Sequence, residues 1–161
     1  MTMVDEDAAA TEYALTRAMK SFESIIVEEE HALIRLSLRQ GRSLSRVTDE
    51  KGKLESISKF ADILIASREK VMFAWSDVNK AVGKLQETWG KVVVKQLGSI
   101  SSARLKYENF LGRGAGLSDI LEGVLQELES QDAAQKVIDR LSAVRETERK
   151  IRQTYEHQTA Q

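Results

Sequence analysis

Apolar residues recur along the middle of the chain at alternating steps of four and three residues. The first run of these positions comprises Val71, Trp75, Val78, Val82, Leu85, Trp89 and Val92. After a shift of one position, a second run comprises Val93, Leu97, Ile100, Ala103, Tyr107 and Phe110. This spacing keeps one stripe of an α-helix facing a neighbouring helix. We therefore predict a long helix from Val71 to Leu111 and, because one helix cannot bury its own stripe, other helices that lie along it.

Another amphipathic helix is predicted near the start of the chain, from about Ala9 to Arg39. Its apolar stripe comprises Leu15, Met19, Phe22, Ile26, Leu33 and Leu36. Glu29 alone interrupts this stripe. We interpret Glu29 as a solvated position or as the partner of a cation on a neighbouring helix, and a buried, switch-like carboxylate is the alternative.

A turn is predicted at Gln40–Ser43, because Gly41 fits the position after a helix and Ser43 or Ser45 can cap the next one. So short a connection makes the two helices antiparallel neighbours. The apolar positions of the next helix are Leu44, Val47, Leu54, Ile57, Phe60, Ala61 and Leu64. Two arrangements then stay open. A bend near residues 66–72, which is favoured, closes a three-helix bundle within one chain, whereas an unbroken rod needs a second chain to cover it.

The clearest boundary in the sequence is rich in glycine, since three of the five residues from Gly112 to Gly116 are glycine. Glycine disfavours helix, so we predict a flexible link at 112–116 between a long-helix bundle, residues 1–111, and a C-terminal helical hairpin, residues 117–161. Ser118 is the expected N-cap of the hairpin. The apolar stripe of its first helix, which is the candidate partner-binding surface, comprises Leu117, Ile120, Leu121, Val124, Leu125 and Leu128. The alternative is that this stripe folds back on the long helices as a layer of the core.

The composition supports an all-α fold. The chain has 161 residues and no proline, and charged residues make up 30% of it against 6% for aromatic ones. Because proline breaks helix interiors, its absence over this length fits long helices, and the high charge fits solvated outer faces. The predicted fold is an elongated antiparallel helical bundle or coiled coil of three long helices plus the C-terminal amphipathic hairpin.

Charge and cysteine content narrow the partners and the compartment. The 24 basic and 25 acidic residues nearly cancel, which argues against nucleic acid and against an acidic membrane as partners. The sequence has no cysteine, no signal-peptide pattern and no apolar run long enough to span a bilayer. We therefore expect a cytoplasmic protein.

Residues with catalytic or metal-binding potential are sparse. Glu28 and His31 have the E-x-x-H spacing of di-iron bundles, but such sites need two of these motifs and two further carboxylates. With no phosphate-binding loop and no nucleophile beside a base, we expect no enzyme activity, no metal and no cofactor. A basic cluster on the last helix is interleaved with Glu146 and Glu148, so we interpret it as an ordinary solvated face. The cluster comprises Arg140, Arg145, Arg149, Lys150 and Arg152.

Two segments carry a family resemblance. Glu28–Leu33 is a glutamate-rich patch on the first helix, and Leu44–Lys51 reads Leu-x-x-Val-Thr-x-Glu-Lys across a short turn. Together they resemble the FlgN-like family, the cytoplasmic export chaperones for flagellar hook-associated proteins. The resemblance extends over about residues 15–110, with Trp75 and Leu85 on the long helix of that family. It implies that the C-terminal apolar stripe captures terminal helices of an exported protein.

Three functions are compatible with these patterns. The first is a non-enzymatic chaperone or adaptor that binds an amphipathic helix of a partner protein, most specifically in flagellar, type III export, with a homodimer as an open alternative. The second is a membrane-associated module that resembles BAR-type crescents, which the predicted long helix motivates. The third is a structural coiled-coil subunit of a larger assembly.

Overall fold

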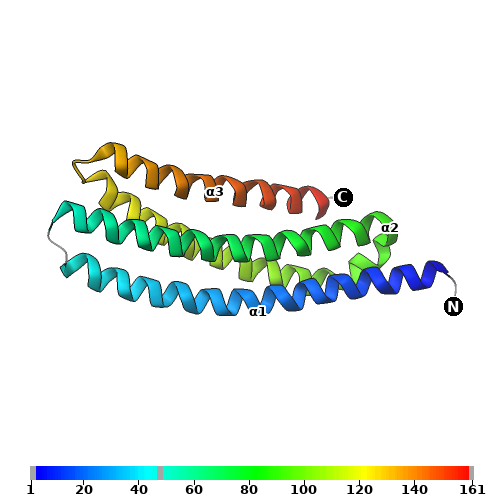
Figure 1. Ribbon diagram of the computed structural model, residues 1–161. Coiled ribbons are helices and arrows are strands. Elements are labelled where there is room, and N and C mark those ends of the chain that lie inside the picture. The colour runs from blue at the N-terminus through cyan, green and yellow to red at the C-terminus, as the bar shows by residue number, and fades with distance from the viewer. Residues whose placement is uncertain (1–2, 47–48, 160–161) are drawn as a thin grey trace.

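The computed structural model describes the backbone of residues 3–46 and 49–159, and the side chains of residues 9–40, 49–85 and 98–153. Three helices make up this part of the chain: α1, Met3–Arg46; α2, Glu50–Gln126; and α3, Gln131–Thr159. The described residues contain no strand, so the predicted all-α fold is confirmed. Figure 1 shows an elongated bundle whose helical segments lie side by side.

Helix α2 doubles back on itself near its middle (Figure 1). The rings of Trp75 and Tyr107 stack with their centroids 5.2 Å apart. In a straight helix two residues with this separation in the sequence would lie about 48 Å apart, so α2 has to reverse between them. We call residues 50–85 the outgoing arm and residues 98–126 the return arm. With the two arms counted separately, four helical segments pack as a bundle.

The apolar stripe from Val71 to Leu111 exists, but the prediction that it forms one straight helix is wrong. Its first run is buried on the outgoing arm at Val71, Trp75, Val78, Val82 and Leu85. Its second run is buried on the return arm at Ile100, Ala103, Tyr107 and Phe110. The shift by one position falls between the arms, where the chain reverses. The remaining members, Trp89, Val92, Val93 and Leu97, lie outside the described side chains.

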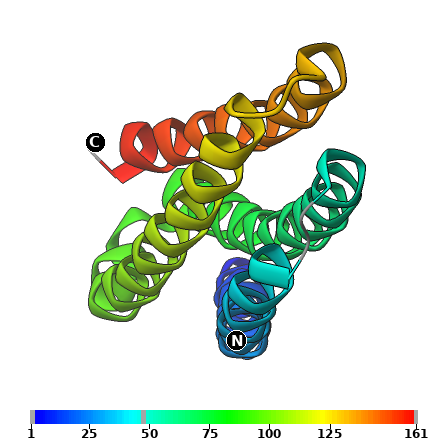
Figure 2. The ribbon, with the colours of Figure 1, turned by 90° about the vertical axis from the view of Figure 1, so that its left-hand side faces the viewer.

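Helices α1 and α3 cover opposite faces of the α2 hairpin (Figure 2). Each packs against α2, and within the described residues α1 and α3 have no close backbone approach to each other. Helix α1 runs parallel to the return arm and antiparallel to the outgoing arm (Figure 1). One side of α1 therefore faces away from the rest of the described bundle.

Helix α1 continues through Gln40–Ser43, so the predicted turn and its serine caps are wrong. A single glycine inside a helix costs about 1 kcal/mol, which the packing of neighbouring residues can outweigh. The N-cap of α2 is instead Asp49, whose side chain accepts a hydrogen bond from Gly52 N at 3.2 Å. The predicted apolar positions Leu44 and Val47 lie outside the described side chains.

Two further breaks in the predicted helices are absent from the described structure. The outgoing arm is helical through residues 66–72, so the favoured bend there is wrong, and the chain reverses between the two arms instead. Residues 112–116 are also helical, so the expected flexible link is wrong and Ser118 lies inside a helix instead of capping one. Buried residues on both sides of 112–116 belong to one hydrophobic cluster. Packing across the bundle thus overrides the local preference of glycine.

Replacing Gly114 with alanine is expected to destabilise the fold, whereas the same change at Gly112 is expected to stabilise it by about 0.5–1 kcal/mol. A Cβ on Gly114 would lie 3.3 Å from Cδ and Nε of Arg68, a buried side chain that three hydrogen bonds hold in place. A Cβ on Gly112 would meet nothing within 4 Å. Urea unfolding followed by circular dichroism measures both effects. An equal gain at the two positions would show that Arg68 has room to move.

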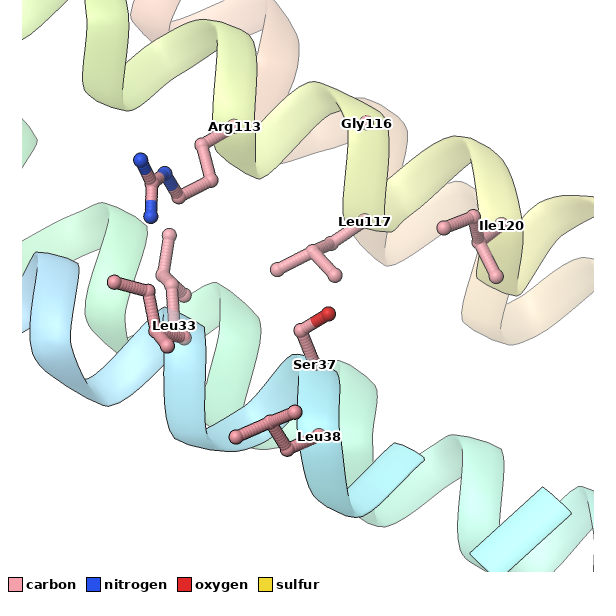
Figure 3. A pocket seen from close by; sticks show the side chains of 8 residues that line it. Leu33, Ser37, Leu38, Arg113, Gly116, Leu117 and Ile120 are labelled. Atoms are coloured by element: carbon pink, nitrogen blue, oxygen red, sulfur yellow. The ribbon is translucent and has the colours of Figure 1, made fainter. Parts of the chain in front are cut away.

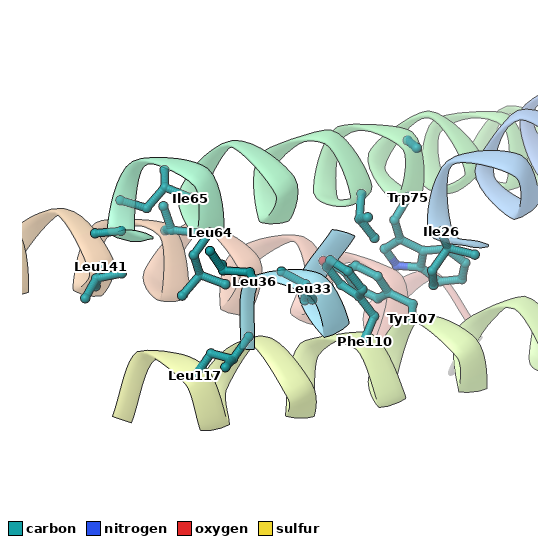
Figure 4. Packing of buried hydrophobic residues seen from close by; sticks show 14 of the residues in the cluster. Ile26, Leu33, Leu36, Leu64, Ile65, Trp75, Tyr107, Phe110, Leu117 and Leu141 are labelled. Atoms are coloured by element: carbon teal, nitrogen blue, oxygen red, sulfur yellow. The ribbon is translucent and has the colours of Figure 1, made fainter. Parts of the chain in front are cut away.

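Three aromatic rings join α1 to both arms of α2 at the centre of the core. Phe22 of α1 lies 5.2 Å from Trp75 and 6.2 Å from Tyr107, measured between ring centroids. Trp75 is 1% exposed, and Figure 4 shows its ring beside that of Tyr107 among the buried aliphatic residues. Trp75 therefore anchors the core between α1 and both arms of α2.

Candidate partner-binding groove

The structure divides the six residues of the predicted binding stripe into buried and open positions. The buried ones are Leu117, Leu121, Leu125 and Leu128. Val124 is half-buried, and Ile120 is 54% exposed. Most of the stripe is therefore a layer of the core, as the alternative interpretation holds. Only the end of the stripe near Leu117 and Ile120 opens to solvent.

An open apolar groove of about 340 Å³ lies at this end, between α1 and the return arm (Figure 3). It is lined by Leu33, Ile34, Ser37 and Leu38 of α1 and by Arg113, Gly116, Leu117 and Ile120 of the return arm. Leu33 and Leu117 are buried and form its floor. Ile34 and Leu38 are 46% and 62% exposed and, with Ile120, form its walls. Apolar side chains that converge on an opening in this way are typical of interaction sites.

The register between α1 and the return arm explains where the groove opens. Lys106 Nζ of the return arm lies 3.6 Å from Glu23 Oε1 of α1. Because the two helices run in the same direction, Ser37 and Ile120 follow this pair two heptads later, and both line the groove. Ser37 has a small side chain, so it fills little of the groove. Gly116 enlarges the gap, since a Cβ at that position would meet nothing within 4 Å.

The groove carries a single charge. Arg113 is the one charged side chain among the residues that line it. Figure 3 shows the Arg113 guanidinium at one end of the groove, on the return-arm side of Leu33. A ligand that fills the groove with apolar groups could therefore place one negative charge at this end.

Sequence reasoning identified Leu117 and Ile120 but missed the wall that α1 contributes. The signal for that wall is a second set of apolar positions on α1. Ile34 and Leu38 are four residues apart and lie off the stripe that includes Leu33 and Leu36. A helix whose main stripe is buried seldom needs such a second set for its own packing, so these positions indicate an interaction surface.

A buried charged cluster joins both arms of α2 to α3, away from the groove. Arg68 donates from Nε to Glu148 Oε2 at 3.0 Å, from Nη2 to Glu148 Oε1, and from Nη1 to Ser118 Oγ at 2.8 Å. Burial raises the pKa of Glu148 above its ordinary value, although Arg68 opposes the rise. Burial also raises the pKa of the nearby Tyr107 hydroxyl, and Glu148 adds to that shift. Each guanidinium nitrogen has a partner, so the cluster ties three segments together.

The structure also shows the surroundings of Glu29 and of the basic residues of α3, which sequence reasoning singled out. Glu29 is buried, and Lys70 Nζ of the outgoing arm lies 3.4 Å from its Oε1, which confirms the predicted pairing with a cation on a neighbouring helix. The basic residues of α3 are exposed, which confirms the interpretation as a solvated face, but Glu148, which that interpretation assigns to the same face, is buried because it pairs with Arg68. The ion pairs on this face are Arg140–Asp62, Arg145–Asp119, Arg149–Glu146 and Arg152–Glu108.

Neither a metal site nor a membrane span is found in the described part of the chain. Glu28 and His31 are exposed, and no three His, Cys, Asp or Glu side chains of the described residues are grouped to hold a metal ion. None of the described helices combines the length and the apolarity that crossing a bilayer requires. Comparison with protein-family models, curated proteins and solved structures finds no match for the chain, so the groove has to be interpreted from the residues that line it.

Proposed function

We propose that the chain is a non-enzymatic helical adaptor that binds an amphipathic helix of a partner protein in the groove between α1 and the return arm. One observation carries this proposal. Three large apolar side chains, Ile34, Leu38 and Ile120, stand exposed around an opening whose floor is itself apolar. Leaving such side chains in water costs free energy, at roughly 25 cal/mol for each Å² of apolar surface that a partner could cover.

The shape and the charge of the groove define the kind of partner. Two helices form its walls, and an amphipathic helix is the element that lays apolar residues at i, i+3 or i+4 and i+7 into such a groove. Arg113 at one end favours a helix with an aspartate or glutamate beside its apolar face. The resemblance of residues 15–110 to FlgN-like chaperones points the same way, and capture of a flagellar export substrate is the specific form of this function that we propose.

The alternatives have less support. The membrane-shaping function rests on the predicted long helix, and α2 folds back on itself, which halves that length. The four arginines of α3 are paired with carboxylates at Asp62, Asp119, Glu146 and Glu108, which weakens the positive field of that face toward an anionic bilayer. A purely structural subunit would have no need of an open groove.

A photo-crosslinking amino acid at position 38 tests the proposal in an extract of the native cells. We expect it to label a partner protein on a peptide whose apolar residues have helical spacing. The Ile120→Glu variant is expected to lose this crosslink, because it places a charge in the wall opposite Leu38. Mass spectrometry of the crosslinked peptides gives the readout.

Two positions outside the groove serve as matched controls. Leu105 is 63% exposed on the return arm and does not line the groove, so Leu105→Glu is expected to leave the crosslink intact. Phe73 is a similarly exposed residue of the outgoing arm, and a crosslinker there is expected to label nothing specific. Equal labelling from positions 38 and 73, or labelling that survives Ile120→Glu, would contradict the proposal.

A further inference from the structure

A second stripe runs along the exposed side of α1, off the buried stripe that packs against α2, and its C-terminal part borders the groove. Its positions follow one another at steps of four, three and four, and they comprise the apolar residues Val27, Ile34 and Leu38 and the polar His31. All four are exposed, and within the described residues α1 packs only against α2, so this part of the chain leaves them uncovered. The stripe extends over about 16 Å of helix. Its spacing is that of a helix which pairs with another helix.

Two opposite charges border one edge of this stripe. Glu28 and Arg35 are one heptad apart, so they lie on the same flank of α1. Both are exposed, and neither has an ion-pair partner among the described side chains. When two helices run antiparallel, residues on the same flank face each other. A flank that carries both a negative and a positive charge is then complementary to itself.

We propose that a second copy of the chain packs antiparallel against this stripe of α1. In this register Val27 lies against Leu38 of the second copy, and His31 lies against Ile34 of the second copy. Glu28 then reaches Arg35 of the second copy. The two-fold symmetry of such a pair repeats every contact, so the interface contains two of these ion pairs.

The same residues disfavour a parallel pair. A parallel arrangement aligns identical positions, so it sets Lys20 against Lys20 and His31 against His31. It also brings Glu28 close to Glu23 of the other chain, with like charges on both sides of the interface. The antiparallel register avoids all three contacts and pairs Glu28 with Arg35.

The proposed pairing concerns the outer face of α1 and does not depend on the proposed function. Ile34 and Leu38 belong both to the stripe and to the groove, so a second copy and a partner helix compete for them. Complexes that bury less than roughly 1,200 Å² are typically weak and transient. Helix contact over so short a stripe buries less surface than this. The pair is therefore expected to form at micromolar or higher concentrations and to yield to a tighter partner.

Charge exchange tests the pairing by sedimentation velocity over a range of concentrations. Glu28→Arg and Arg35→Glu are each expected to weaken self-association about tenfold, because each replaces two attractive contacts with two repulsive ones. An equimolar mixture of the two variants, or the double variant in one chain, is expected to restore it. Lys136→Glu, at an exposed position on α3, which does not pack against α1 in the described structure, is the control and is expected to change nothing.

Disulfide trapping tests the direction, since the chain has no cysteine of its own. A mixture of Val27→Cys and Leu38→Cys chains is expected to form the mixed disulfide under mild oxidation. Either variant alone is expected to stay unlinked, because its two cysteines would be about 16 Å apart along the antiparallel pair. Circular dichroism of each variant verifies that the helices are intact.

These results test the pairing of α1 independently of partner binding in the groove. A wild-type chain that stays monomeric at the highest concentration, or Glu28→Arg that associates more tightly, would overturn the antiparallel pair. So would rapid disulfide formation by Val27→Cys alone, which indicates a parallel pair. The Ile120→Glu variant, which is expected to lose the partner helix, keeps the Val27 and Leu38 contacts and is expected to self-associate normally.

Discussion

Replacing Glu148 with alanine is expected to lower the free energy of unfolding by about 3–5 kcal/mol, because it leaves the Arg68 guanidinium buried without a counter-charge. Arg68 is 1% exposed, and Glu148 accepts two of its three hydrogen bonds. Urea unfolding followed by circular dichroism measures the loss. Glu146 is the control: it pairs with Arg149 on the exposed face of α3, so Glu146→Ala is expected to have a far smaller effect than Glu148→Ala.

Removing both charges is expected to cost far less than removing one. In the double variant Arg68→Met, Glu148→Leu, no charge stays buried, and replacements of this kind are neutral or stabilising by up to about 4 kcal/mol. The Ser118 hydroxyl, which loses its donor, can bond to the carbonyl of Gly114 one turn earlier in its own helix. A double variant as unstable as Glu148→Ala would show that Arg68 and Glu148 contribute more through specific geometry than through mutual neutralisation.

The pH dependence of stability gives an independent measure of the same cluster. Burial raises the pKa of Glu148 above its ordinary value of 4.5, so the folded chain holds this proton more tightly than the unfolded chain does. The stability that this proton contributes is present below pH 4.5 and is lost as the pH rises through the raised value. The double variant, which has no carboxyl at position 148, is expected to lack this loss.

The buried faces of the helices could be predicted from periodicity, and the path of the chain could not. The stripe that includes Val78 and Tyr107 is buried almost as expected, because apolar spacing reports which side of a helix is covered. Spacing does not report where a helix reverses. The arms of α2 are set by contacts such as Trp75 with Tyr107, which join residues that are remote in the sequence.

The buried polar cluster of the core could not be predicted from the sequence either, because its members are remote from one another along the chain. In the sequence, Arg68 belongs to a polar segment where a bend is predicted. Ser118 follows a glycine-rich stretch, which is the position expected of a helix N-cap. Both are instead buried in helices and bonded to each other, and the third member, Glu148, comes from α3. Local chemistry cannot reveal a partner that tertiary packing supplies.

The candidate site was predictable only in part, because a groove is defined by what two helices fail to fill. The apolar character of Leu117 and Ile120 is visible in the sequence, but Ile120 borders a groove whose other wall comes from α1. Burial of Leu121 in the same stripe follows from the packing of the return arm. The apolar pattern alone treats these three positions alike.

Replacing Trp75 with alanine is expected to lower the free energy of unfolding by about 3–5 kcal/mol, the range for deletion of a large buried aromatic side chain. Trp75 contacts Phe22 of α1 and Tyr107 of the return arm, so its loss opens a cavity where three of the four helical segments meet. Close packing lets neighbouring side chains fill such a cavity only in part.

Phe73, two residues away and mostly exposed, provides the matched control for Trp75. Phe73→Ala is expected to change the free energy of unfolding by no more than about 0.5 kcal/mol, since surface substitutions away from special features have effects of this size. Urea unfolding of both variants by circular dichroism at 222 nm avoids the fluorescence change that loss of a tryptophan brings. If Trp75→Ala costs no more than Phe73→Ala, the stacked rings do not hold the two arms of α2 together. The reversal of α2, on which the groove between α1 and the return arm depends, would then need another cause.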